Sequence, residues 1–199
     1  MQFDYIYSGY LASPAQAALV EKAHALWPEA YLVVDPVMGD GGKLYSGVAD
    51  TMPEAMRRLA AAADLVLPNA TEAALLLGRP YAEPAGPEDA KALADAVQQA
   101  LGCKNAVVTG MPIGRYLYCA GAGEEAFVCR QLHAERSFPG TGDLFGAVLI
   151  SRLSMGNALS AATEAAAAFV ADCITNTPAD ADTRQGVCFE PQLWHLAAR

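Results

Sequence analysis

Short apolar runs alternate with amphipathic helical stretches along the first half of the chain, and this alternation constrains the fold most. The strand-like runs cover residues 3–7, 31–35, 64–67 and 105–109, and the helical stretches cover 14–27, 53–63, 69–77 and 88–101. Strands that alternate with helices at such short spacing are typical of a mostly parallel sheet with crossover helices. The pattern therefore predicts an α/β fold.

The remaining segments are assigned with the same signals. We expect a mobile glycine-rich loop at 38–45, a hairpin or two edge strands at 115–119 and 126–130, helices at about 141–155 and 157–176, and an irregular tail from 184 to 199 with one strand near Val187. Both late helices are rich in alanine and are predicted to pack on the sheet.

Length and composition predict one domain over residues 1–199. The chain has 199 residues with 53% hydrophobic content, which is enough to bury one sizeable core. Charged residues make up 18%, so the sequence is not that of a disordered chain. The first strand begins at about Phe3 with no lead-in, which suggests a chain that begins in the middle of a fold.

Charge and cysteine usage exclude several functional classes. The formal net charge is −9 and no lysine or arginine cluster occurs, so nucleic acid and an anionic membrane surface are not expected partners. No apolar window is long enough for a transmembrane span, and no signal peptide is evident. The five cysteines are scattered without metal-ligand spacing, as in a protein of the reducing cytoplasm.

The stretch at 137–149 carries the strongest chemical signal. Gly140, Thr141 and Gly142 open directly into an apolar helical run, so unshielded N–H groups and the helix dipole would favour an anion. We expect Asp143 to stay ionised beside them and to accept a hydroxyl proton, as phosphoryl transfer requires. The alternative is a plain helix start in which Thr141 or Asp143 caps the first turn.

Polar residues also follow the predicted strands. Ligands of α/β folds bind beyond the carboxyl ends of the strands, where Asp35, Asn69, Glu72 and Thr109 are placed. A strand-end aspartate suits Mg²⁺, although it could equally be a solvated acid. Asn69 and Glu72 have the spacing of a capping box, and that structural role is compatible with a carboxylate facing hydrated Mg²⁺.

Two tyrosines follow glycine-containing segments at the same predicted edge. Tyr10 and Tyr45 could pack in the core, or they could stack on an aromatic ligand. Their position beside the predicted cleft favours stacking.

Four segments in this order resemble the pyridoxal (pyridoxamine) kinase family of the ribokinase-like superfamily. They are Phe3-Asp-Tyr-Ile-Tyr-Ser-Gly-Tyr10, Asp35-Pro-Val-Met-Gly-Asp40, Leu67-Pro-Asn-Ala-Thr-Glu72 and Gly140-Thr-Gly-Asp143. The last segment marks the superfamily alone, whereas the second, with the Gly-Lys-Leu-Tyr45 that follows it, points to vitamin B6 kinases. The resemblance implies a three-layer α/β/α fold.

The resemblance implies ATP-dependent phosphorylation of the 5′-hydroxymethyl group of pyridoxal, pyridoxamine or pyridoxine. Asp143 would be the base on that hydroxyl. The amides of Gly140, Thr141 and Gly142 would hold the transferred phosphoryl group. Tyr10 and Tyr45 would contact the pyridine ring or close over it.

The resemblance also implies a nucleotide and metal site. Asp35 and Glu72 would act around Mg²⁺ and the ATP phosphates, with Asn69 and Thr109 nearby. Asp40 resembles a position that serves a monovalent cation (K⁺ or Na⁺) or the phosphate loop. Leu67 stands where relatives often carry a hydroxyl residue, which counts against the monovalent cation. A homodimer is implied as well.

Relatives usually have a sizeable segment before the strand at Phe3, so we expect an N-terminally truncated fold with an exposed sheet edge. Two other functions stay open. One is a hydroxymethylpyrimidine kinase of the same superfamily, and the other is an inactive remnant that binds nucleotide without turnover.

Overall fold

The computed structural model describes residues 1–134 and 136–197. They form two compact units, which are described separately below. Unit 1 comprises Met1–Ile113 and Tyr118–Val128, and unit 2 comprises Gly114–Leu117 and the chain from Cys129 onward. The single-domain organisation stays a prediction.

Unit 1 contains the alternating strands and helices that the sequence predicts. In chain order they are β1 (Tyr5–Ser8), α1 (Pro14–Leu26), β2 (Tyr31–Val34), β3 (Gly39–Asp40), β4 (Lys43–Leu44), α2 (Met52–Ala61), β5 (Leu65–Val66), α3 (Ala70–Leu77), α4 (Pro87–Leu101) and β6 (Asn105–Ile113). Strands β7 (Tyr116–Ala122) and β8 (Phe127–Leu132) have residues in both units. The helices that follow β1, β2 and β5 are crossovers between parallel strands.

The six-stranded sheet has the order β1-β2-β5-β6-β7-β8. The pairs β1–β2, β2–β5 and β5–β6 are parallel, with Tyr7 opposite Val33 and Val34 opposite Val66. Strand β1 lies at one edge of this sheet. The predicted α/β fold with a mostly parallel central sheet is thus confirmed.

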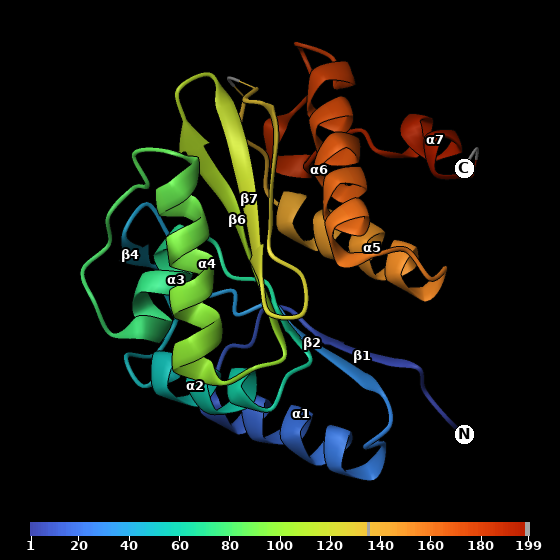
Figure 1. Cartoon of the computed structure of the whole chain (residues 1–199). Helices are drawn as coiled ribbons and strands as arrows, with labels where there is room; N and C mark the ends of the chain where they lie inside the picture. The colour runs from blue at the N-terminus through green and yellow to red at the C-terminus, as the bar shows by residue number, and fades with distance from the viewer. Residues whose placement is uncertain (135, 198–199) are drawn as a thin grey trace. The chain divides into compact units, whose positions relative to one another are not determined.

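The central strands are buried because parallel sheets are covered on their faces. Leu32, Val33 and Val34 of β2 are fully buried, as are Leu65 and Val66 of β5. Helices α3 and α4 pack on β6, and α1 to α4 run along one face of the unit 1 sheet (Figure 1). This packing fixes the carboxyl ends of β1, β2 and β5 at one edge.

The glycine-rich segment after β2 differs from the expectation. Instead of a loop, strands β3 and β4 form a small antiparallel hairpin with Gly39 opposite Leu44. Gly41 and Gly42 make its turn with φ values of 57° and 78°, which glycine adopts without strain. The glycines therefore build a defined turn here.

Unit 2 contains α5 (Thr141–Ser154) packed on α6 (Leu159–Asn176), close to the predicted helix bounds. The expected strand near Val187 is wrong. The described tail instead forms two 3₁₀ turns, Thr183–Gln185 and Glu190–Gln192, and the short helix α7 (Trp194–Ala197).

Local backbone geometry explains this difference. Gly186 has a φ of 81°, and Pro191 in the second 3₁₀ turn has no N–H to donate, so an extended strand is interrupted on both sides of Val187.

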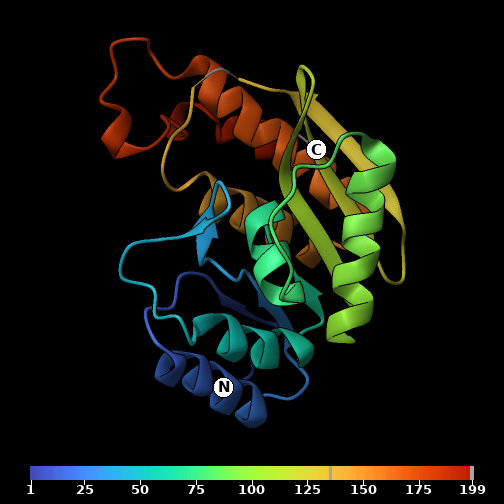
Figure 2. The same cartoon turned by 90° about the vertical axis from the view of Figure 1, so that its left-hand side faces the viewer.

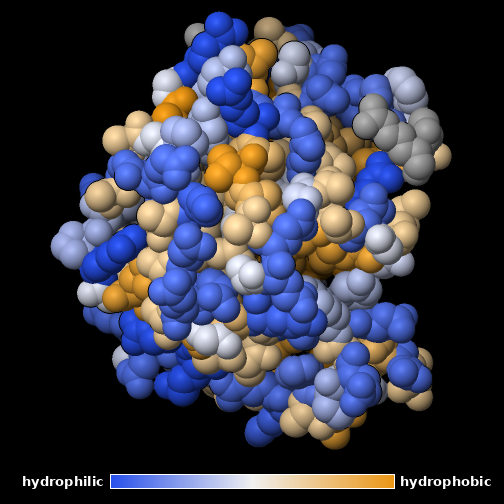
Figure 3. Space-filling view, viewed as in Figure 1, coloured by the Kyte–Doolittle hydropathy of each residue, from blue (hydrophilic) through white to orange (hydrophobic). Residues whose placement is uncertain are grey.

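No helix in the described part of the chain is long and apolar enough to cross a membrane. Figure 3 shows hydrophobic residues as separate patches among hydrophilic ones.

Candidate functional site

Asp35 lies directly after β2 and is 7% exposed. Its N–H donates to the Ser8 carbonyl oxygen at 2.8 Å, so the ladder between β1 and β2 continues past the strand end. The Tyr7 hydroxyl donates to Asp35 Oδ2 at 2.9 Å. The predicted strand-end carboxylate is therefore buried and held at the carboxyl edge of the sheet.

Asn69 and Glu72 form the predicted capping box at the start of α3. The Asn69 side-chain oxygen accepts the Glu72 N–H at 2.9 Å, and Glu72 Oε2 accepts the Asn69 N–H at 2.9 Å. The other carboxylate oxygen, Oε1, accepts the Met38 N–H at 3.0 Å. Glu72 thus joins the helix start to the segment after Asp35.

The Glu72 carboxyl group is nearly fully buried, and burial raises its pKa to about 8. The negative charge of Asp35 raises this pKa further, whereas the N–H bonds from Asn69, Met38 and Gly39 oppose the shift. A divalent cation beside the two carboxylates would reverse the charge contribution, because opposite charge favours the ionised form. Two carboxylates in one acidic environment are the kind of ligands that Mg²⁺ uses in nucleotide sites.

The capping box also holds the β3–β4 hairpin, shown in light blue beside the start of α3 in Figure 2. Asn69 Nδ2 donates to the Gly39 carbonyl oxygen at 2.8 Å, and the Gly42 N–H donates to Thr71 Oγ1 at 2.9 Å. A Cβ on Gly39 would overlap the Lys43 carbonyl oxygen. Sequence reasoning missed the roles of Gly39 and Thr71, because each depends on a partner segment that only the fold identifies.

Thr109 lies in β6 next to the same helix start. Its N–H donates to the Pro68 carbonyl oxygen at 2.9 Å, and an isolated parallel bridge joins it to Asn69. The structure therefore brings Asp35, Asn69, Glu72 and Thr109 together in unit 1, as the strand order predicts.

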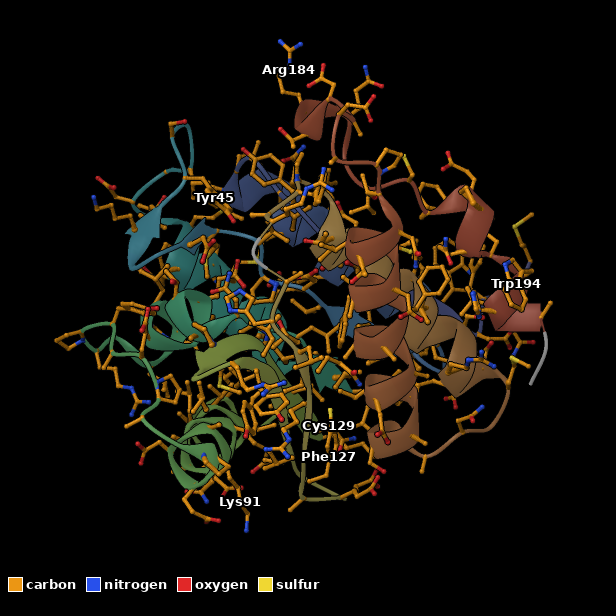
Figure 4. All side chains as sticks on the ribbon, turned by 90° about the horizontal axis from the view of Figure 1, so that it is seen from above. Tyr45, Lys91, Phe127, Cys129, Arg184 and Trp194 are labelled. Atoms are coloured by element: carbon orange, nitrogen blue, oxygen red, sulfur yellow. The ribbon has the colours of Figure 1, made fainter. Side chains whose placement is uncertain are left out.

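Tyr45 follows β4 and is labelled in Figure 4. Burial raises the pKa of its hydroxyl, and the negative charges of Glu72, Asp40 and Asp35 raise it further. Asp40 is exposed, and its Oδ1 accepts the Gly41 N–H at 2.8 Å within the hairpin turn. Tyr10 lies in the loop after β1 and is 53% exposed.

Ser8 lies at the same carboxyl edge, within the Ser-Gly-Tyr10 segment that the sequence places beyond the first strand. It ends β1, is 4% exposed, and its Oγ has no hydrogen-bond partner among the described residues. Buried hydroxyl groups are usually satisfied, so this one indicates a missing polar neighbour at the carboxyl edge. Its position at the end of the first predicted strand already makes it a candidate for this edge.

Unit 2 carries the second part of the predicted site, the Gly140–Asp143 turn. Gly140 is the N-cap of α5 with a φ of 80°, and no described side chain caps this helix. Thr141 Oγ1 turns back to donate to the Phe138 carbonyl oxygen at 3.2 Å. The alternative of a helix start capped by Thr141 or Asp143 is therefore wrong.

The uncapped first turn of α5 is also open. A Cβ built on Gly140 or Gly142 meets no atom within 4 Å, and the Asp143 side chain is exposed. The first-turn N–H groups can thus reach a ligand, and the positive end of the helix dipole favours an anion there.

Arg136 supports this turn and was not predicted. Its guanidinium donates to the carbonyl oxygens of Thr177 at 2.6 Å and Pro178 at 2.9 Å, and it lies 4.7 Å from the Phe138 ring centroid. The segment before Gly140 is thereby attached to the end of α6. These partners lie more than 40 residues away in sequence, so no local pattern could identify them.

Comparison with known proteins decides the family. Residues 1–187 match the family described as phosphomethylpyrimidine kinase. The pyridoxal kinase of Lactobacillus plantarum is 33% identical with a TM-score of 0.89, and the match covers 100% of this chain and 72% of that one. The chain belongs to the pyridoxal kinase family.

Two further relatives agree with this assignment. A Bacteroides thetaiotaomicron protein described as a phosphomethylpyrimidine kinase, solved in a form with pyridoxal, is 30% identical with a TM-score of 0.91, and the match covers 99% of this chain and 72% of that one. The pyridoxal kinase PdxY of Pseudomonas fluorescens is 31% identical over 186 residues, which cover 88% of this chain and 63% of the relative. This pyridoxal kinase family member thus spans about three fifths of the length of that curated relative.

Proposed function

We propose that this chain is a B6-vitamer kinase that transfers the γ-phosphoryl group of ATP to the 5′-hydroxymethyl group of pyridoxal, pyridoxamine or pyridoxine. The observation that carries the proposal is the uncapped, open first turn of α5, in a chain whose relatives are named pyridoxal kinases. An exposed carboxylate, Asp143, stands in that turn.

In this proposal the N–H groups of Gly140, Thr141 and Gly142 stabilise the charge on the transferred phosphoryl group. Such donors are already oriented before the reaction and need no rearrangement. Asp143 accepts the proton of the attacking hydroxyl and holds it as the phosphate ester forms. Tyr10 and Tyr45, both partly exposed, are proposed to contact the pyridine ring.

Asp35 and Glu72 are the residues that would hold Mg²⁺. Among the described residues no group of three or more His, Cys, Asp or Glu could hold a metal ion by itself. Mg²⁺ in nucleotide sites typically uses one or two carboxylates together with phosphates and water, so this pair fits. When bound, the ion would neutralise charge on the phosphates. Asn69 and Thr109 are proposed to lie beside the nucleotide.

Three further expectations accompany the proposal. A monovalent cation near Asp40 rests on the resemblance alone, because one Asp40 oxygen serves the hairpin turn and the side chain of Leu67 offers no ligand. A homodimer and a cytoplasmic location are likewise proposals. The dimer is tested by the mass of the purified protein in light scattering.

A second candidate is phosphorylation of hydroxymethylpyrimidine, and the family description over residues 1–187 favours it. Both candidates transfer a phosphoryl group to a hydroxymethyl group on a heteroaromatic ring. The two differ in the ring that the substrate pocket accepts.

A substrate panel tests the proposal. ADP release is measured with Mg-ATP and each of pyridoxal, pyridoxamine, pyridoxine and hydroxymethylpyrimidine. Pyridoxal 5′-phosphate is the control, because its 5′-hydroxyl is already esterified. We expect turnover with a B6 vitamer and none with the control. Turnover with hydroxymethylpyrimidine alone would support the second candidate, and nucleotide binding without any product would support an inactive remnant.

A further inference from the structure

We propose that Tyr7 is a positioning residue that orients the Asp35 carboxylate toward a divalent cation. The proposal rests on the proposed function, because that function places Mg²⁺ at Asp35. Both residues lie in unit 1, and the family resemblance assigns no role to Tyr7.

Strand register brings the two side chains together. Tyr7 lies opposite Val33 in the parallel β1–β2 pair, and Asp35 follows Val33 by two residues on the continuing ladder. Residues two apart in a strand share a face, so Tyr7 and Asp35 are diagonal cross-strand neighbours. The Tyr7 hydroxyl spans this diagonal and donates to Asp35 Oδ2 at 2.9 Å.

The local backbone gives Asp35 little help in fixing its carboxylate. The next residue is Pro36, which has no N–H, and the Val37 N–H donates to the Asp35 carbonyl oxygen. A buried carboxylate needs hydrogen-bond donors, and the tyrosine supplies one from the neighbouring strand.

The chemistry of the donor suits a cation site. A tyrosine hydroxyl is neutral, so it fixes the carboxylate through Oδ2 without adding the positive charge that a lysine or arginine would bring. Hydrogen-bond partners of metal-binding carboxylates commonly matter for affinity by about 10- to 100-fold.

The test measures Mn²⁺ binding by electron paramagnetic resonance on the full chain, with a non-hydrolysable ATP analogue present. Tyr7→Phe removes the hydroxyl and keeps the ring, and we expect it to weaken Mn²⁺ binding about tenfold. The matched control is Tyr5→Phe on the same strand face, which should leave the Kd unchanged. In an Asp35→Asn background Tyr7→Phe should cause no further loss, because the two changes remove one interaction.

An unchanged Kd in Tyr7→Phe, or an equal loss in the Asp35→Asn background, would overturn the proposal. Neither result would bear on whether the wild-type chain turns over its substrate. Partial unfolding of a variant lowers the binding stoichiometry and leaves the Kd, so both values are read from one titration. Wild-type protein that binds no Mn²⁺ would overturn the role of Tyr7 together with that of Asp35. Failure of the proposed function looks different, since Mn²⁺ would bind normally and no ADP would form.

Discussion

Glu72 and Asn69 hydrogen-bond each other reciprocally, each side chain accepting the other's backbone N–H at 2.9 Å. The same asparagine donates from Nδ2 to the Gly39 carbonyl oxygen, and the same glutamate accepts the Met38 N–H. One helix start therefore organises the acidic residues and the hairpin of unit 1.

Replacing Asn69 by alanine removes the cap of α3 and the bond to the hairpin. We expect Asn69→Ala to lower the free energy of unfolding by about 2 kcal/mol, since caps and neutral hydrogen bonds each contribute about 1 kcal/mol. Asn69→Ser retains a capping oxygen and should recover about half of the loss. Equal urea midpoints for the wild type and Asn69→Ala would contradict this role.

Glu72 should make stability depend on pH in the metal-free protein. Its pKa is about 8 when folded and 4.5 ordinarily, so the folded chain binds the proton more tightly. The stabilisation that Glu72 adds to the free energy of unfolding is fully present below pH 4.5 and is lost as pH rises through 8. Between pH 6 and 9 we expect the wild type to lose about 3 kcal/mol more than Glu72→Gln. Parallel pH profiles in urea unfolding would refute the assignment, and added Mg²⁺ should flatten the wild-type profile.

Gly39 should not tolerate a side chain, because a Cβ would overlap the Lys43 carbonyl oxygen across the hairpin. We expect Gly39→Ala to lower the thermal midpoint and to destabilise the chain by about 1–3 kcal/mol. Gly86→Ala is the control, because Gly86 is extended with a φ of −163° and has open space around it. Similar midpoints for the two variants would argue against a fixed hairpin.

A substitution at Gly142 should affect catalysis without lowering stability. A Cβ there meets no atom within 4 Å, and alanine is favoured over glycine in helices by about 0.5–1 kcal/mol, so Gly142→Ala should be at least as stable as the wild type. If the first turn of α5 holds the transferred phosphoryl group, the methyl group should reduce kcat by about tenfold or more. Full activity in a stable Gly142→Ala variant would exclude a close phosphoryl contact at this position.

Much of the fold was predictable from periodicity and turn residues. The parallel strands, the crossover helices and the opening of α5 after Gly140 all follow from local apolar spacing and from glycine or proline boundaries. The Asn69–Glu72 capping box was predictable because it lies within one helical turn.

The rest depends on contacts between distant segments. The hairpin at Gly39 is held by a bond from Asn69, 30 residues away, and Arg136 reaches Thr177 across 41 residues. Local sequence carries no information on such pairs, so the glycines at 38–45 predict only a loop. The sequence also could not predict that α5 lacks a side-chain cap. Threonine is a good capping residue, but the Thr141 hydroxyl donates to the Phe138 carbonyl oxygen instead.

The most direct test of the account is single-turnover phosphorylation of pyridoxal by the wild type and by Asp143→Asn, with nucleotide binding measured in parallel. Asparagine keeps the size of the side chain and cannot take the hydroxyl proton. The account predicts phosphate transfer by the wild type, a loss of about a hundredfold or more in Asp143→Asn, and unchanged nucleotide binding. Transfer at the wild-type rate in Asp143→Asn would contradict the central claim that this carboxylate is the base.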